Sequence, residues 1–345
     1  MSDLRVAIIG FGLAGSVFHA PLIAATAGLA VSAVVTSNPQ RGEAVRRDHP
    51  DARLMTSVEE LWESAADHDV VVIASPNDLH VPQARRALDL GMAVVVDKPL
   101  APSAAEAREL LQHAEGLGRF LTVFHNRRWD SDQVTLRRLI SEGALGDVFR
   151  YESRLERWRP QLPADKALRE LTPSTGGGVL LDLGTHLVDQ ALVLFGPATD
   201  VWGEVDLRSG GVADDRAFVA IRHASGVHSH LSPSELTAAP GPRLRVLGTR
   251  AAYVIAEVDG QEDALREGRR PGDPDGWGVE PESRWGRLVA GDRSEAVASE
   301  HGAWPDFYAG LVRAVRDGSP PPVDPWDAVA TLEVLDEARR DAASA

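Results

Sequence analysis

The feature that most constrains the fold is a glycine pattern near the start of the chain. A short apolar run at residues 4–9 leads into G-F-G-L-A-G at residues 10–15. A strand, three spaced glycines and then a helix are what a dinucleotide-binding βαβ unit requires. Gly10 permits a tight turn, Gly12 lets a pyrophosphate approach the backbone, and Gly15 lets the helix pack closely on the strand. A glycine-rich turn without a ligand is the alternative. The predicted phosphate-binding residues are Gly10, Gly12, Leu13 and Gly15.

The end of the next predicted strand, residues 31–35, bears on which dinucleotide binds. Thr36, Ser37 and Asn38 follow this strand, and Arg41 comes shortly after. A site for NAD usually carries an acidic residue here, which bonds the ribose 2′-hydroxyl, whereas an arginine accommodates the 2′-phosphate of NADP. We therefore predict NADP(H), with NAD as the alternative. These polar residues can also cap the next helix, and the two roles are compatible.

A third strand, residues 69–74, leads into Ser75, Asn77 and His80. These side chains follow the carboxyl end of a strand, which is where ligands bind in open α/β sheets. We assign them to the cofactor site. Asn77 and His80 either reach the nicotinamide ribose or cap the following helix, and the sequence does not decide between these roles.

A fourth strand places a lysine at the same edge of the sheet. The run A-V-V-V at residues 93–96 predicts a strand buried on both faces. Asp97 and Lys98 follow it, and Pro99 then ends the hydrogen-bonded ladder. Of the 36 basic residues 34 are arginine, so lysine is rare here. Because lysine is a compact donor whose pKa can shift, we predict that Lys98 is catalytic and that both Asp97 and Lys98 line the cofactor site. An ordinary surface lysine is the alternative.

The alternation of strands and helices predicts a doubly wound parallel sheet that ends near residues 120–124. From residue 201 onward, short strand-like runs recur with Gly, Pro and Asp between them, which predicts a largely antiparallel sheet. The predicted fold class is therefore α/β, with a dinucleotide-binding domain at residues 1–123 and an α+β substrate domain at residues 124–345.

H-N-R-R-W-D at residues 125–130 follows the last strand of the first domain. Arginines and a tryptophan at a strand's carboxyl end can bind a polyhydroxylated ligand, although an interdomain hinge with salt bridges is an equal alternative for Arg128. A further strand at residues 149–158 ends in R-W-R. The predicted substrate residues are Asn126, Arg127, Trp129 and Arg157.

G-G-G-V-L-L-D-L-G-T-H at residues 176–186 is the second decisive stretch. The apolar residues predict one buried helix that runs to about residue 195, with Asp182 and His186 on one face. Histidine titrates near neutral pH and can exchange a proton with a substrate oxygen, while the aspartate can orient it. The glycines would leave room for a ligand. The alternative is an ordinary pair one turn apart. No third ligand lies at a metal-binding spacing, so no metal is predicted.

Composition limits the partners. The formal net charge of −15 argues against nucleic acid and against anionic membrane surfaces. There is no cysteine and no apolar run of about 18 residues, and no charged and apolar leader precedes residue 4. We therefore expect a cytoplasmic protein that acts on a small molecule.

Together, G-F-G-L-A-G, D-K-P and G-G-G-x-x-x-D-x-x-x-H resemble the Gfo/Idh/MocA oxidoreductase family along the whole chain. G-S-V-F-H-A-P-L at 15–22, F-H-N-R-R-W-D at 124–130 and D-G-Q-E-D-A-L at 259–265, with the T-S strand end, are similar to its NADP-dependent scyllo-inositol 2-dehydrogenase branch. The resemblance implies a second domain with a large open sheet, which in such relatives often builds homodimers or homotetramers. It also implies the catalytic set Lys98, Asp182 and His186. Asp97 departs from the family's usual E-K-P, which leaves the role of that carboxylate open.

We therefore expect an enzyme that transfers a hydride between a nicotinamide and a secondary alcohol or ketone of a cyclic polyol or sugar, with scyllo-inositol and inosose as candidates. His186 would exchange the hydroxyl proton, Lys98 would stabilise charge on the same oxygen, and Asp182 would orient His186. The alternatives are another sugar dehydrogenase, a redox-assisted eliminase, or a nucleotide-sensing regulator without activity.

Overall fold

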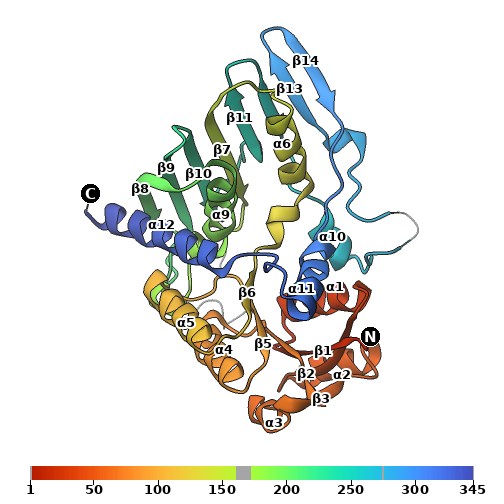
Figure 1. Ribbon diagram of the computed structural model, residues 1–345. Coiled ribbons are helices and arrows are strands. Elements are labelled where there is room, and N and C mark those ends of the chain that lie inside the picture. Colours follow the sequence, from red (N-terminus) through yellow and green to blue (C-terminus); the bar gives the residue numbers. More distant parts are fainter. Residues whose placement is uncertain (1, 161–171, 274–275, 345) are drawn as a thin grey trace.

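The computed structural model describes residues 2–160, 172–273 and 276–344 and contains two sheets (Figure 1). The first sheet is parallel and has the strand order β3-β2-β1-β4-β5-β6, with its switch point between β1 and β4. Its strands are β1 (Leu4–Ile9), β2 (Leu29–Val35), β3 (Arg53–Met55), β4 (Val70–Ile73), β5 (Ala93–Asp97) and β6 (Leu121–Phe124). The predicted doubly wound sheet is confirmed, although the short strand β3 was missed.

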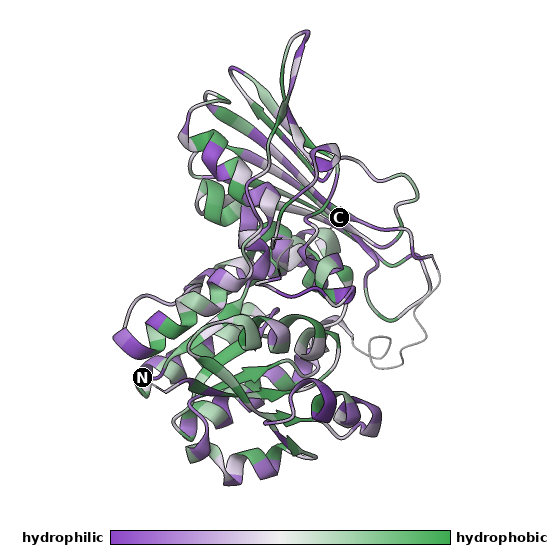
Figure 2. Cartoon of the chain, turned by 90° about the vertical axis from the view of Figure 1, so that its right-hand side faces the viewer, coloured by the Kyte–Doolittle hydropathy of each residue, from purple (hydrophilic) through white to green (hydrophobic). Residues whose placement is uncertain are grey.

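Helices cover both faces of this sheet. Alternate residues of its strands therefore pack in two different apolar cores, one on each face. Val71 of β4 packs in one apolar cluster and Val72 in the other, and Figure 2 shows the apolar strands enclosed by helices. The helical segments of this part are η1 (Ala14–His19), α1 (Ala20–Ala25), α2 (Pro39–Asp48), α3 (Val58–Glu63), η2 (Ala65–Asp67), η3 (Asn77–Leu79), α4 (His80–Asp89) and α5 (Ala104–Gly116). The segment η1 is a π-helix that ends at His19, and α1 then begins with Pro21 in its first turn.

The second sheet has the order β14-β13-β12-β11-β7-β10-β9-β8, and all its pairs are antiparallel except β7 with β10. The predicted largely antiparallel sheet is thus confirmed, and the hairpin β13–β14 was missed. Its strands are β7 (Val148–Glu156), β8 (Ala198–Asp206), β9 (Arg216–His223), β10 (His228–Ser234), β11 (Leu244–Gly248), β12 (Ala252–Ile255), β13 (Gly286–Ala290) and β14 (Arg293–Val297).

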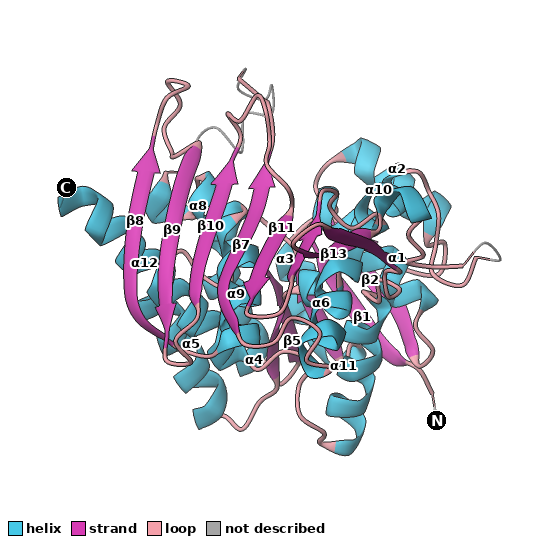
Figure 3. Ribbon diagram, turned by 90° about the horizontal axis from the view of Figure 1, so that it is seen from above, coloured by secondary structure: helices cyan, strands magenta, loops and turns pink. Residues whose placement is uncertain are grey.

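Helices pack on one face of the second sheet (Figure 3), where α9 contacts β10 and α12 contacts β8. The chain also returns to the first sheet, because Phe307, Tyr308 and Leu311 of α11 share a core with β1 and β4. The helical segments of this part are η4 (Asn126–Trp129), α6 (Ser131–Ser141), η5 (Pro173–Thr175), α8 (Val179–Asp182), α9 (Gly184–Phe195), α10 (Gln261–Arg266), η6 (Glu282–Arg284), α11 (Pro305–Asp317) and α12 (Pro325–Ser344).

Within the described ranges, no single helix is long and apolar enough to cross a membrane. The segments Pro173–Asp182 and Gly184–Phe195 meet the length and composition criteria only as a pair, bent by 64°. Most residues of the second segment, α9, are buried inside the protein.

Arg128, whose side chain is largely enclosed, joins three elements just after the carboxyl end of β6. Arg128 of η4 donates from Nε and Nη2 to both carboxylate oxygens of Asp189 on α9, at 2.8 and 2.6 Å. Nη2 also donates to Asp327 of α12 at 2.9 Å. Asp189 is almost completely buried, so its charge depends on this arginine. Of the alternative given for Arg128, an interdomain hinge with salt bridges, the structure contains the salt bridges.

We predict that Asp189→Ala lowers the free energy of unfolding by about 3 kcal/mol, because the Arg128 guanidinium loses two hydrogen bonds and keeps only the part-exposed Asp327 as a partner. Urea denaturation followed by circular dichroism measures this change. The matched control is Asp200→Ala, which removes an exposed pair with Arg222 and should cost less than about 1 kcal/mol. Equal losses in the two variants would contradict the importance of the buried pair.

Candidate active site

Lys98 and Asp182 bring the two halves of the molecule together. Nζ of Lys98 donates to Oδ1 of Asp182 at 2.5 Å and to its backbone oxygen at 2.9 Å. The Lys98 side chain is 17% exposed, whereas that of Asp182 is 56% exposed. The ammonium is therefore enclosed between the carboxyl end of β5 and the end of α8, while the carboxylate opens towards solvent.

The single helix expected through Asp182 and His186 is interrupted. Helix α8 ends at Asp182 and α9 begins at Gly184, so the chain bends between the two side chains. In the described part of the chain no hydrogen bond joins Asp182 to His186, and Nδ1 of His186 has no partner. Asp182 instead turns to Lys98. The pairing across one helical turn was wrong because Leu183 separates two short helices.

The glycines before α8 make contacts within the protein, whereas we expected them to leave room for a ligand. A Cβ on Gly176 would lie 2.6 Å from Cβ of Asn77, and one on Gly178 would lie 2.2 Å from Oδ1 of Asp214. Oδ2 of Asp214 accepts a hydrogen bond from the backbone N–H of Leu180 at 2.7 Å. Asp214 therefore caps α8 from a distant part of the chain and positions the segment that ends in Asp182.

The charges around the pair set its protonation. Partial loss of water acts to raise the pKa of Asp182, although its side chain is 56% exposed, but the Lys98 ammonium outweighs this effect, with a contribution from Arg157, and the pKa lies below its usual value. Burial lowers the pKa of His186 well below its ordinary value, and the positive charges of Lys98 and Arg127 lower it further. His186 is therefore neutral at neutral pH and can accept a proton from a ligand.

His125 is a buried residue that we did not place in the site. It follows β6 directly, is 1% exposed, and neither ring nitrogen has a hydrogen-bond partner in the described residues. Its Nδ1 lies 3.9 Å from Oδ2 of Asp189, and its charge contributes to the low pKa of His186. The register of the two strands could have identified it. Phe124 of β6 pairs with Asp97 of β5, so the residues that follow them, His125 and Lys98, lie side by side.

The glycine loop fits a dinucleotide. A Cβ on Gly10 would lie 2.4 Å from the oxygen of Ala74, and one on Gly15 would lie 2.1 Å from the oxygen of Gly10, so packing requires both glycines. A Cβ on Gly12 would meet only Nη1 of Arg41, at 3.9 Å. The backbone at Gly12 therefore faces open space at the start of a helical segment, where a phosphate can approach the free N–H groups.

The end of β2 provides polar groups beside this loop. Oδ1 of Asn38 accepts from the backbone N–H of Arg41 at 3.1 Å, which confirms the capping interpretation. Thr36 Oγ1 accepts from the N–H of Asn38 at 3.4 Å, and Ser37 is exposed. Leu13 is 48% exposed at the start of η1. The Arg41 guanidinium thus lies near the phosphate loop, and residues 36–38 contain no carboxylate.

Ser75, Asn77 and His80 contact protein groups. The ring nitrogens of His80 lie 2.8 Å from the oxygen of Pro99 and 3.0 Å from that of Ser75, so this buried ring connects the carboxyl ends of β4 and β5. Asn77 donates to the oxygen of Gly176 at 2.7 Å, and the Ser75 hydroxyl donates to a side chain of α4. These contacts brace the crevice.

Two of the predicted substrate residues lie near the pair. Arg127 is buried and donates to Glu262 at 2.8 Å, and Arg157 donates to Glu235 at 3.4 Å. Both guanidinium groups contribute to the low pKa of Asp182, which places their charges beside the crevice. Arg127 and Arg157 are therefore each bonded to a carboxylate and lie near the candidate catalytic pair.

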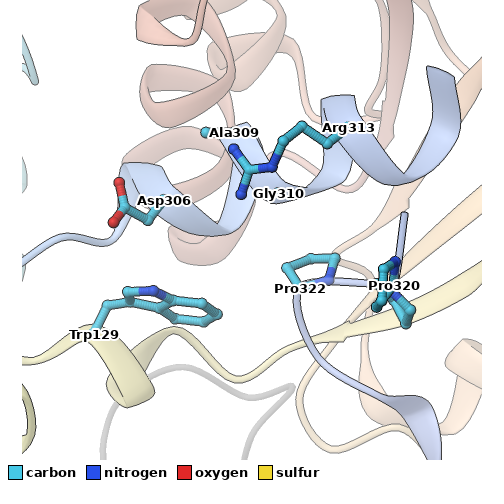
Figure 4. A pocket seen from close by; sticks show the side chains of 8 residues that line it. Trp129, Asp306, Ala309, Gly310, Arg313, Pro320 and Pro322 are labelled. Carbon is cyan, nitrogen blue, oxygen red and sulfur yellow. The ribbon is translucent and has the colours of Figure 1, made fainter. Parts of the chain in front are cut away.

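The other two predicted substrate residues are placed differently. Asn126 is buried in η4. The Trp129 ring lines a hollow of about 360 Å³ under α11, together with Asp306, Arg313 and the proline turn at residues 320–322 (Figure 4). None of the candidate catalytic residues lines this hollow, so Trp129 and the Lys98 pair belong to different surfaces.

The chain matches two sequence-family models. Residues 4–125 match an oxidoreductase family with an NAD-binding Rossmann fold, and residues 134–254 match the GFO/IDH/MocA C-terminal domain. Over 342 residues the chain is 33% identical to scyllo-inositol 2-dehydrogenase (NADP(+)) IolW of Bacillus subtilis strain 168, an alignment that covers 98% of this chain and 93% of the relative. The chain belongs to the Gfo/Idh/MocA family.

Two further members of similar length support this assignment. The uncharacterized oxidoreductase YdgJ of Escherichia coli K12 is 37% identical over 340 residues, or 97% of this chain and 96% of that protein. The structure of the Bacillus subtilis oxidoreductase yvaA superposes with a TM-score of 0.92 at 32% identity and covers 99% of this chain and 97% of that one. The resemblance inferred from the motifs is confirmed, and the protein is an oxidoreductase of the dehydrogenase type with an NAD-binding Rossmann domain.

We predict that Gly12→Ala folds normally but weakens dinucleotide binding at least about tenfold, because the new methyl group occupies the space that a pyrophosphate needs. Cofactor fluorescence titration measures binding, and thermal unfolding monitors the fold. The matched control is Gly116→Ala at the exposed end of α5, where a Cβ meets nothing within 4 Å. Normal binding by Gly12→Ala would show that the loop does not hold phosphate.

Proposed function

We propose that the protein catalyses reversible hydride transfer between NADP(H) and a secondary alcohol carbon of a cyclic polyol or sugar, with scyllo-inositol and inosose as the first candidates. The observation that carries the proposal is the enclosed Lys98 ammonium, bonded to Asp182 at the carboxyl end of β5. A neutral, buried His186 lies on the next helix. The name of the relative IolW supports both the substrate class and the cofactor.

The chemistry of these side chains gives each a separate role in the proposed reaction. The bound nicotinamide supplies the carbon that takes or gives the hydride. His186 accepts the hydroxyl proton during oxidation and returns it during reduction, because its depressed pKa keeps the ring neutral and ready to accept. Lys98 donates a hydrogen bond to the same oxygen and stabilises the developing negative charge. Asp182 holds Nζ of Lys98 in place through its short contact.

The preference for NADP(H) rests on the end of β2. Thr36, Ser37 and Asn38 stand where an NAD site usually carries a carboxylate. Arg41 lies 3.9 Å from the position of a Cβ on Gly12, so its guanidinium is near the phosphate loop. A guanidinium binds phosphate through two parallel hydrogen bonds, which suits the 2′-phosphate of NADP.

The proposal extends to assembly and location. The face of the second sheet opposite α9 and α12 carries the half-exposed ring of Trp202, with the Arg222 guanidinium 5.7 Å from its centroid. We propose that this face joins copies of the chain into a homodimer or homotetramer. The protein would act in the cytoplasm on a small polyol or sugar.

We predict that Lys98→Met and His186→Ala each reduce turnover by roughly 10²–10⁴ while NADPH binding is retained, since each removes a group that acts on the reacting oxygen. NADPH absorbance with inososes and ketoses measures turnover. His228→Ala, in a strand of the second sheet, is the control and should leave turnover unchanged. Near-wild-type turnover of either variant would refute the assignment, and cofactor cycling without net turnover would favour an eliminase.

We predict that Arg41→Ala weakens NADPH binding by about tenfold or more, because it removes a charge-assisted hydrogen bond to the 2′-phosphate, and leaves NADH binding unchanged. Dissociation constants for both cofactors measure the effect. Arg46→Ala is the control on the same helix, where the arginine bonds Glu43. Equal losses for NADPH and NADH, or a wild-type preference for NADH, would contradict the proposed cofactor.

A further inference from the structure

A buried histidine connects the phosphate-binding element to the start of the D-K-P motif. His19 is the last residue of η1 and is completely buried. Its Nδ1 lies 2.5 Å from the hydroxyl oxygen of Tyr308, and its Nε2 lies 3.6 Å from Oδ1 of Asp97. The ring packs on Phe124 with centroids 4.4 Å apart, so the imidazole has little freedom to turn. Neither His19 nor Tyr308 has a part in the mechanism given above.

The chemistry of the three groups sets the direction of the hydrogen bonds. A carboxylate only accepts, and a neutral imidazole carries one proton. When the Nε2 proton of His19 faces Asp97, Nδ1 must accept, and the Tyr308 hydroxyl must donate to it. Burial, together with the charge of Asp97, raises the pKa of Tyr308 well above its usual value, so this hydroxyl keeps its proton. The 3.6 Å separation is longer than a hydrogen bond, and such contacts often tighten when an enzyme binds its ligands.

The titratable groups that face Asp97 come from several elements. They are His19 of η1, Tyr308 of α11, His80 of α4 and the adjacent Lys98. Burial acts to raise the pKa of Asp97, but the contact with His19 and the neighbouring positive charges outweigh it, so the pKa lies below its ordinary value. Without the His19 ring, the Asp97 carboxylate would still be buried but would lose the ring N–H that faces it. Its charged form would then be less stable, and its pKa would rise.

The position of Asp97 suggests what its charge does. In a sheet of this order the two halves of the dinucleotide lie over the two halves of the sheet. The phosphate loop after β1 and the polar end of β2 serve the adenosine half, so the ends of β4 to β6 face the nicotinamide half. Asp97 ends β5, and its side chain is 17% exposed. A nicotinamide ring is positively charged when oxidised and neutral when reduced, so a carboxylate there distinguishes the two forms.

We propose that His19 and Tyr308 are positioning residues that act through Asp97. They hold its carboxylate at the nicotinamide half of the crevice, where its negative charge favours oxidised over reduced cofactor. This inference rests on the proposed cofactor and not on the identity of the polyol. Asp97 of D-K-P has a shorter side chain than the glutamate that is usual in the family. His19, at the end of the helical segment after the glycine loop, faces this shorter carboxylate.

The decisive measurement is the ratio of the dissociation constants for NADP⁺ and NADPH as a function of pH. Asp97→Asn should raise this ratio roughly tenfold, since it removes a negative charge near a positive ring. In His19→Phe the pKa of the still-buried Asp97 rises. The preference for NADP⁺ should then be lost at a higher pH than in the wild-type protein when the pH is lowered, because the carboxylate of the variant takes up its proton earlier. Tyr308→Phe should give a smaller change in the same direction.

Three further variants separate positioning from packing. His19→Gln retains an N–H that can reach Asp97 and should behave like the wild type. His223→Phe and Tyr151→Phe remove an equally buried imidazole and phenol hydroxyl in the second sheet and should leave the ratio unchanged. If His19→Phe weakens both cofactors equally at every pH, His19 only packs against its neighbours and the proposal fails.

Nitrogen NMR of the histidine rings tests the same proposal without any cofactor. The His19 signals are those lost in His19→Phe, and they should show the Nε2–H form at neutral pH, with a mixture of forms in Tyr308→Phe. An Nδ1–H form in the wild-type protein would overturn the proposal. Absence of turnover with every polyol and ketose would count against the proposed substrate, while the binding ratio and the ring tautomer still decide the role of His19.

Discussion

The site depends on one contact between an ammonium and a carboxylate that belong to different halves of the fold. Lys98 can reach Asp182 because β5, whose three valines are fully buried, places it at the sheet edge and because α8 ends at that carboxylate. Neither support is local: Asp214 caps α8 from a loop, and Asn77 bonds the backbone ahead of it. The contact is therefore a property of the assembled domains and not of any one motif.

The electrostatics around this contact are arranged so that one group stays uncharged. Two arginines near the site form salt bridges with carboxylates, Arg127 with Glu262 and Arg128 with Asp189. These partners stabilise the guanidinium groups but leave a positive electrostatic field around the site. That field and the loss of water both disfavour a protonated His186. In the proposed reaction the neutral imidazole of His186 would be the proton acceptor and the Lys98 ammonium the proton donor that interconversion of an alcohol and a ketone needs.

Much of the fold follows from local patterns, and the misses have physical reasons. The strand β1 with its glycines and the buried valines of β5 carry strong local signals and lie where they were predicted. The three-residue β3 and the exposed strand β14 have too little apolar pattern to be recognised. The contacts of His19 and His125 are with residues far along the chain, which spacing alone cannot reveal.

The packing of α11 has a consequence for how this protein is made. Trp304, Phe307 and Tyr308 complete the core beneath the first sheet, beside residues of β1 and β4. During synthesis these aromatic rings leave the ribosome some 300 residues after β1. The amino-terminal sheet therefore keeps part of its apolar surface uncovered until residues 304–311 have been translated. Domains that fold as independent units escape this delay, so we expect the nascent chain to expose this surface for longer than such a domain would.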